Sequence, residues 1–470
     1  MKFKSGKTMK TLALALTLVL SIGSLAGCGN KVNDKNEAGQ TIVSVGNWPK
    51  TGKALENRTA IENQFEESNA DIAIEPDPWV FDRKSFYPKA AGGQLPTVYE
   101  VAYTEAPEII ESGYSADLTD ALKKHGFDGK FNQDILDIVT KDGKIWAFPI
   151  NAYMFGLGCN MDIMKQAGLV DADGTPKQPK DWFEMAEMAV QIKEKTGKPG
   201  FFMPTAGNCG GWMFMSIAWS FGVDFMEQNS DGKWQATFNT PEAIEALEFI
   251  KSLKWDYDVM PSNSIIDLTE YYKIIGTDGA GMYIVPGDYS GSVVQYAMDP
   301  NKLGIMAMPK GPKAHVTLLG GAVHGVSNTA TDDQIDGAVR WFKTLYNFEA
   351  TDEYKETIQR RYDTRLSQNQ HIGIKTASIW NKNSDGLAYD YAVMEEKSTT
   401  NPNHVRLYNE FITNCPAEIR AEEPVCCQEL YQILDGCIQE VLTNKDADCA
   451  TLIEKASADF QANYLDNLTY

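Results

Sequence analysis

Aromatic rings stand beside amide or carboxylate side chains at two points where a predicted strand ends. Asn47 and Trp48 follow the run "TIVSVG". Tyr103 is the last residue of the run "PTVYEVAY", and Glu105 follows it. A flat ring can cover an apolar face of a small molecule, while amides and carboxylates hydrogen-bond to its hydroxyl groups. Because loops after parallel strands share one edge of a sheet, we expect these four side chains at one ligand-binding cleft.

Catalytic motifs are missing from the same sequence. It contains no Gly-x-Ser-x-Gly elbow, Walker loop or His-Glu-x-x-His helix, and its five histidines are not spaced as zinc ligands. The stretch "DADGTPKQPKDW" resembles a calcium loop, but Pro176 replaces the required glycine and Trp182 the bidentate glutamate. Glu100, Glu105 and Asp288 could supply a glycosidase pair, although any acidic protein offers such carboxylates. We therefore expect a binding protein without metal or cofactor, not an enzyme.

The N-terminus predicts export. Four lysines precede the uncharged run "TLALALTLVLSIGSLAG", which is typical of a secretory signal and too short for a membrane span. The following "LAGC" resembles the bacterial lipobox, which implies cleavage after residue 27 and a diacylglycerol on the thiol of Cys28. Acyl chains would then hold the protein at the membrane surface, and the polar residues 28–40 would form a flexible tether. Plain secretion with an incidental cysteine is the alternative.

Length and charge limit the classes of protein. About 430 residues follow the predicted tether, which is too many for one hydrophobic core and predicts two lobes. The formal net charge of −21 argues against nucleic acid or anionic lipid as the ligand. Apart from Cys28 the chain has seven cysteines, five of them after residue 410, so disulfides within one chain would leave a free thiol. One or two disulfides near the C-terminus are possible by this count.

Strands and helices alternate along the first part of the chain. Residues 41–47 and 71–76 read as strands and the segment 56–70 between them as a helix, which is a β-α-β unit. Helix signals are clear further on, at 179–197, 240–257 and 331–347. The segment "GKIWAFPINAYMFGLGCN" reads as two extended runs broken at Pro149, and the region after residue 350 is mostly helical. This alternation predicts an α/β protein with mainly parallel sheets.

Five segments resemble one family, in order along the chain. They are "GGQLPTVYEV", "GKIWAFPINAYMFGLGCNMDIMKQAGL", "QPKDWFEM", "GAGMYIVPGDY" and "LGIMAMPKGP". Together with the lipobox they are similar to the extracellular solute-binding proteins of ABC importers, in the carbohydrate-binding, maltose-binding-protein-like branch. Several positions depart from the family pattern, such as Thr97 for aspartate and Trp146 for tyrosine.

The resemblance implies a two-lobed periplasmic-binding-protein-like fold of type II, with mainly parallel sheets flanked by helices and a helical C-terminal region. Crossovers between the lobes are expected near 149–152 and 306–309, with a third near 347–351. The expected division is a signal peptide at 1–27, a tether at 28–40, an N-lobe of 41–149 with 306–349, and a C-lobe of 150–305 with 350–470. Ligand binding would then close the hinge between two rigid lobes.

The same resemblance extends the candidate ligand site. Asn151 and Tyr153 would flank the first crossover, and Trp212 stands in a glycine-rich loop where the family often places an aromatic residue. Asp288 and Tyr289 stand where the family pattern has a tryptophan platform, which indicates a ligand that stacks differently. His324 follows a glycine turn near the expected cleft.

The function implied is capture of a mono- or oligosaccharide by a lipid-anchored, monomeric receptor at the extracytoplasmic face of a bacterial membrane. The receptor would deliver the sugar to the permease of an ABC importer, and only its lipid would enter the membrane. Two alternatives stay open from the sequence: a cell-surface polysaccharide-processing enzyme, and a sugar sensor that hands its ligand to a membrane kinase.

Overall fold

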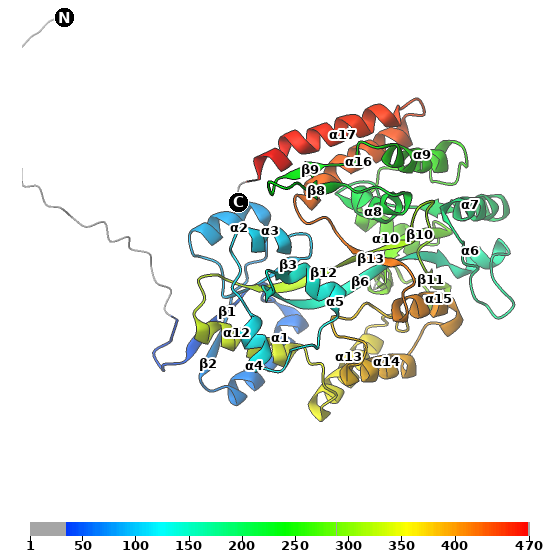
Figure 1. Cartoon of the computed structure of the whole chain (residues 1–470). Helices are drawn as coiled ribbons and strands as arrows, with labels where there is room; N and C mark the ends of the chain where they lie inside the picture. The colour runs from blue at the N-terminus through cyan, green and yellow to red at the C-terminus, as the bar shows by residue number, and fades with distance from the viewer. Residues whose placement is uncertain (1–33, 288, 469–470) are drawn as a thin grey trace, which may run out of the picture.

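The computed structural model describes residues 34–287 and 289–468 (Figure 1). The predicted signal peptide, Cys28 and Asp288 lie outside the described residues. Of the predicted tether, residues 34–40 are described, and they fold back onto the first strand: the amide of Ile42 donates to the carbonyl of Asp34 at 2.8 Å, and Lys35 pairs with Asp333 at 3.1 Å.

A first group of strands lies in the order β2-β1-β3-β12-β6, and β13 extends it along β12. Alternate residues of β1 are buried, as expected for a strand that is covered by helices. Strand β1 pairs with β2 and β3 in parallel, whereas β12 runs antiparallel to β3 and β6. The bounds are β1 Thr41–Val45, β2 Ile72–Pro76, β3 Val98–Ala102, β6 Ala147–Asn160, β12 Val316–Val326 and β13 Glu418–Ala421.

A second group forms around the far half of β6. There β6 pairs antiparallel with β10 and β11, and β10 pairs in parallel with β7. The sheets are therefore mixed, which corrects the prediction of mainly parallel sheets: the two long strands β6 and β12 run antiparallel to each other, β12 also runs antiparallel to β3, and β6 to β10 and β11. The bounds are β7 Phe201–Phe202, β10 Met282–Pro286 and β11 Leu303–Met306.

Strand β6 connects the two groups without a break. Residues up to Met154 pair with β12, and residues from Phe155 pair with β10. The sequence predicted an interruption at Pro149, but the strand continues and only its register shifts, next to Ala322 and Val323 on β12. Such an irregularity accommodates proline, which has no N–H to donate to the ladder.

Helices cover both groups of strands (Figure 1). Around the first group they are α1 Gly52–Ser68, α2 Arg83–Ala91, α3 Ala106–Glu111, α4 Thr119–Lys124, α5 Gln133–Leu136 and α12 Asp332–Leu345. Around the second they are α6 Met161–Gln166, α7 Trp182–Thr196, α8 Cys209–Phe221, α9 Pro241–Trp255, α10 Leu268–Gly276 and α11 Ser290–Val293. Two small two-stranded sheets are separate from these groups: β4 Thr140–Lys141 pairs with β5 Lys144–Ile145, and β8 Met226–Gln228 pairs with β9 Trp234–Ala236.

The ends of the three predicted helices confirm the local signals. Helix α7 stops at Gly197, which adopts the left-handed conformation that glycine tolerates best. Helix α9 begins with Pro241 after a Thr240 cap whose hydroxyl accepts from the amide of Ala243. Helix α12 has a full capping box between Thr331 and Gln334.

The chain after residue 350 is helical, as predicted, and returns to both strand groups. Its helices are α13 Asp352–Ser367, α14 Asp385–Glu396, α15 Pro402–Thr413, α16 Cys427–Thr443 and α17 Cys449–Asn463. In α15, Tyr408 donates to the carbonyl of Met154 at 2.7 Å, at the point where β6 changes partners. The sequence did not predict β13, which pairs with β12 in parallel.

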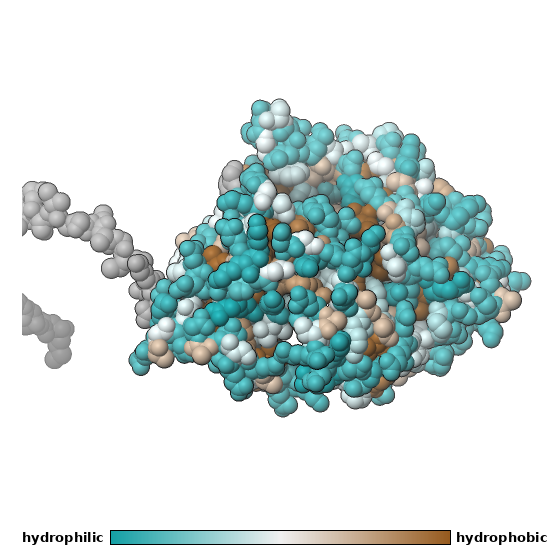
Figure 2. All heavy atoms as spheres, turned by 60° about the horizontal axis from the view of Figure 1, so that its bottom comes forward, coloured by the Kyte–Doolittle hydropathy of each residue, from teal (hydrophilic) through white to brown (hydrophobic). Residues whose placement is uncertain are grey.

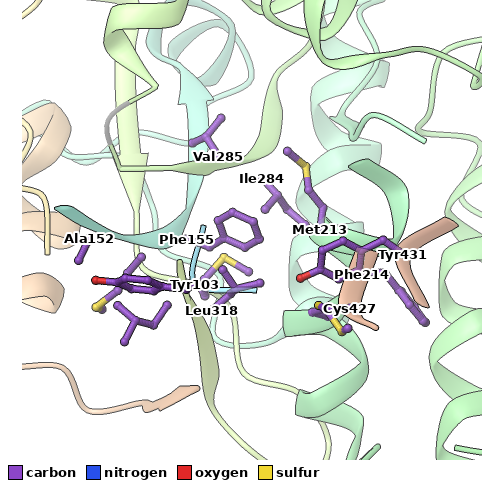
Figure 3. Packing of buried hydrophobic residues seen from close by; sticks show 14 of the residues in the cluster. Tyr103, Ala152, Phe155, Met213, Phe214, Ile284, Val285, Leu318, Cys427 and Tyr431 are labelled. Carbon is purple, nitrogen blue, oxygen red and sulfur yellow. The ribbon is translucent and has the colours of Figure 1, made fainter. Parts of the chain in front are cut away.

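Buried aromatic and aliphatic side chains from both strand groups pack together beside β6 (Figure 3). All seven cysteines of the described residues are free. The face in Figure 2 is mostly hydrophilic, with hydrophobic residues in small separate patches. Within residues 34–287 and 289–468, no helix is long and apolar enough to cross a membrane.

Candidate functional site

Four predicted residues lie where β6 passes between the strand groups. Trp212, at the start of α8, packs edge-on against Tyr153 with ring centroids 6.1 Å apart, and both rings are partly exposed. The Tyr153 ring lies over Gly320, where a Cβ would come within 2.2 Å of the tyrosine oxygen. Tyr103 donates to the carbonyl of Asn151 at 2.7 Å (Figure 3 shows Tyr103). The Tyr153–Trp212 pair is therefore a partly exposed ring surface.

An ionic network stands beside this pair. Arg83, the first residue of α2, contacts Glu105 and Glu108 of the α3 segment, both at 2.6 Å. Tyr87 donates to Glu108 at 2.9 Å. The same arginine reaches Glu429 of α16 at 3.5 Å, which joins the first strand group to the second. Burial raises the pKa of Glu105, although the positive charge of Arg83 acts in the opposite direction.

A second polar bridge runs parallel to the ionic one. Gln428 of α16 donates to the hydroxyl of Thr104 at 3.4 Å. Asn208, just before α8, donates to the side-chain oxygen of Gln428 at 3.1 Å. Asp435 holds the start of α8 by accepting from the amides of Asn208 and Gly211 at 2.8 and 2.7 Å. The N-terminal ends of α8 and α16 thus present amides and a carboxylate toward the loop that follows β3.

The sequence analysis missed Arg83, Asn208, Gln428 and Glu429, although it predicted Glu105 by its place after a strand. Arg83 and Glu429 belong to helices far apart in the sequence, and neither stands beside a strand end. No local pattern could have joined them, because their proximity depends on how the C-terminal segment returns across the strands.

Trp48 and His324 lie apart from these residues, in the packing of α12. Trp48 is 6% exposed and stacks on Trp341, with ring centroids 6.1 Å apart. His324 stacks on Phe342 and makes a 3.3 Å hydrogen bond with the hydroxyl of Tyr346. Burial lowers the pKa of His324 to about 3, so the imidazole is neutral at pH 7. Ligand contact by either residue stays a prediction, and in this conformation their surfaces are already covered.

The remaining predicted residues fall into two classes. Asn47 is exposed and donates to Glu100 at 2.9 Å, and Asn151 is exposed while its oxygen accepts from the amide of Ala322. Tyr289 is fully buried and donates to the carbonyl of Gly304 at 3.0 Å. Asp288 lies outside the described residues. Within the described ranges, no group of three or more His, Cys, Asp or Glu side chains is placed to hold a metal ion.

Known structures share this fold. The maltose-bound MalE3 protein of T. maritima aligns with 89% of the chain and 99% of its own length, at 20% identity and a TM-score of 0.64. The cyclic alpha-maltosyl-1,6-maltose binding protein of Arthrobacter globiformis aligns with 92% of the chain and 100% of its own, at 22% identity and a TM-score of 0.64. The fold is therefore that of the periplasmic binding proteins, which confirms the predicted class.

Sequence comparison gives the family. Residues 55–388 match the family described as Bacterial extracellular solute-binding protein, and the chain belongs to this family. The Arabinooligosaccharide-binding protein of Bacillus subtilis (strain 168) is 22% identical over 312 residues, which are 64% of this chain and 68% of that protein. The protein is thus a solute-binding protein and not an enzyme, as the sequence predicted.

Proposed function

We propose that the protein captures a carbohydrate between its two strand groups and delivers it to the permease of an ABC importer. The similar proteins support this proposal, because their names state arabinooligosaccharide, maltose and a cyclic maltosyl-maltose as ligands. The two lobes would be residues 41–149 with 306–349 and residues 150–305 with 350–470, and β6 and β12 would form the hinge.

One observation carries the proposal: a partly exposed ring surface lies near two polar bridges that join the strand groups. Tyr153 and Trp212 offer partly exposed rings, which suit the C–H faces of a sugar. The bridges from Arg83 to Glu429 and from Thr104 to Gln428 cross between the strand groups. Hydroxyl groups of a solute could replace these bridges. Hydrogen bonds from both lobes to the ligand would then hold the lobes together, instead of the direct contacts between them.

Buried residues have a supporting role in this proposal. Tyr103 and Glu105 are 2% and 5% exposed, and each is tied to a neighbour, Asn151 and Arg83. They would orient the groups that touch the solute. Asn47 and Asn151 are exposed and would contact a larger oligosaccharide or the water around it.

The proposed location is the extracytoplasmic face of the bacterial membrane. A lipid on Cys28 would keep the monomeric receptor close to the permease, and two or more acyl chains suffice for stable anchoring. Replacing Cys28 by alanine should release the exported chain from the membrane fraction into the medium. Recovery of that variant with the membrane, at the wild-type fraction, would contradict the anchor.

A thermal-shift screen against a glycan panel tests the binding function. A sugar present at 100 times its dissociation constant should stabilise the wild-type protein by about 2.7 kcal/mol. Trp212→Ala should abolish this shift, while Phe183→Ala, at an exposed ring on α7, should preserve it. If no glycan shifts the wild-type midpoint, or if the shift persists in Trp212→Ala, the proposed site is wrong.

A further inference from the structure

A separate cavity lies on the other side of β6. It has a volume of about 240 Å³. Its walls come from residues 150–152 of β6, from residues 345–347 at the end of α12, and from α13, α14 and the loop 376–380 between them. In Figure 1, α13 and α14 lie on one side of β6 and β12, while α8 and α16 lie on the other. We call this cavity the hinge pocket. None of Arg83, Tyr153, Trp212 or Glu429 lines it, and Asn151 is the candidate-site residue that also lines the hinge pocket.

Aromatic rings form much of its wall. Tyr346, Tyr354, Trp380 and Tyr391 all line the hinge pocket. Trp380 is fixed from behind by Phe131, with ring centroids 5.2 Å apart, and Tyr391 is fixed by its hydrogen bond to the carbonyl of Thr376 at 3.0 Å. Rings held in this way form a rigid surface for the apolar faces of a ligand.

The charged groups of the pocket are already paired with each other. Arg361 forms an ion pair with Asp390, and Tyr362 donates to the same carboxylate at 2.8 Å. An anionic ligand would have to compete with Asp390 for the arginine, and a cationic ligand would have to compete with Arg361 for the carboxylate. The pocket therefore favours a neutral molecule.

Hydrogen-bond donors remain at the rim. The side-chain oxygens of Asn151 and Asn347 accept from the amides of Ala322 and Glu349, at 3.0 and 3.1 Å. This leaves the Nδ2 groups of both asparagines as donors beside the pocket. A ligand with several hydroxyl or ether oxygens can accept from them, while its C–H faces contact the rings.

We propose that the hinge pocket is a second binding site, for a neutral, hydroxyl-rich molecule the size of one monosaccharide. The volume is below the range of about 300 to 1,000 Å³ that is usual for drug-sized ligands, so an oligosaccharide would not fit as a whole. Aromatic walls, a neutralised ion pair and two amide donors are the groups that recognise such a molecule.

Ala377 allows the pocket to be blocked. Its methyl group lines the cavity and is partly buried, and a tryptophan at this position would fill the space. Ala377→Ser is the matched control, since it adds one oxygen and leaves the volume nearly unchanged. Asn347→Ala is a second variant, which removes a proposed donor without filling the pocket.

The test is isothermal titration of the mature protein with D-glucose, D-galactose, L-arabinose and glycerol. At least one probe should bind the wild type and Trp212→Ala with the same affinity within about twofold, and Ala377→Trp should weaken it by about tenfold or more. Asn347→Ala should weaken it by about threefold to tenfold. Ala377→Ser should bind as the wild type does.

The opposite pattern overturns the proposal. Binding that is lost in Trp212→Ala and kept in a folded Ala377→Trp would place the monosaccharide at the site beside α8. Absence of binding by all four probes would also reject the hinge pocket. Neither result depends on the oligosaccharide screen, so failure of the proposed transport function can be distinguished from failure of this site.

Discussion

Arg83 on α2 and Glu429 on α16 lie 3.5 Å apart, and this ion pair joins the two strand groups. Arg83 is held more closely by Glu105 and Glu108, both at 2.6 Å. If the groups separate, the arginine keeps two partners in its own lobe and Glu429 loses one. The pair is therefore a contact that can open at low cost, as a hinge around a solute requires.

Glu429→Gln should weaken this contact and leave the fold intact. Both partners are about a quarter exposed, so the free energy of unfolding should change by less than about 1 kcal/mol. Small-angle scattering of the unliganded variant should show a larger radius of gyration than the wild type. Glu270→Gln, which breaks an exposed pair within α10, is the control and should leave the scattering unchanged. A scattering profile identical to that of the wild type would reject the role of Glu429 in holding the two strand groups together.

The two tryptophans that the sequence proposed for the ligand site should behave differently when truncated. Trp48→Ala removes a buried ring that stacks on Trp341, so it should lower the free energy of unfolding by about 3 kcal/mol or more. Trp212→Ala removes a partly exposed ring, so it should cost less stability and abolish solute binding. Chemical denaturation and the glycan screen measure both effects. A near-normal midpoint for Trp48→Ala would show that its ring contributes little to the core.

Local signals in the sequence predicted local structure well. Gly197, Thr240 and Pro241 mark helix ends through the backbone conformation or side-chain bond of a single residue, and they lie at the ends of the predicted ranges 179–197 and 240–257. The continuity of β6 through Pro149 was not predictable, because it depends on a register shift against a strand more than 150 residues later. The strand β13 was missed for the same reason: four residues become a strand only by pairing with β12.

The prediction of the site residues from the sequence was limited in the same way. Tyr153 and Trp212 were found through a family resemblance, and they do contact each other. Trp48 stands after a strand end, as a ligand residue would, yet Trp341 from α12 covers it. Whether a ring after a strand faces solvent or a helix is decided by a partner that the local sequence does not contain.

Glu423 should make the protein less stable as the pH rises. Burial raises its pKa to about 7, although Arg420 and a hydrogen bond from Trp219 favour the ionised form. The unfolded chain loses this proton near pH 4.5. The contribution of Glu423 to the free energy of unfolding is therefore full below that pH, and it is lost as the pH rises through 7. Glu423→Gln should remove this loss, which is about 3 kcal/mol by pH 9. Chemical denaturation at pH 5 and pH 9 measures this loss. Glu270→Gln, at an exposed carboxylate, is the control and should show the same difference in unfolding free energy between the two pH values as the wild type.

His324 should have the opposite effect, a loss of stability in acid. Its pKa is lowered to about 3 by burial, whereas the unfolded chain binds a proton near pH 6.5. Between these values only the unfolded state is protonated, so stability falls as the pH decreases, by about 1.4 kcal/mol for each pH unit. His324→Gln should reduce this slope between pH 6.5 and 4. Tyr346→Phe removes the hydrogen bond to the imidazole but no group that titrates in this range. It should therefore lower the free energy of unfolding by the same amount at each pH and leave its slope against pH unchanged. An unchanged slope in His324→Gln would show that the imidazole is protonated in the folded protein as readily as in the unfolded chain.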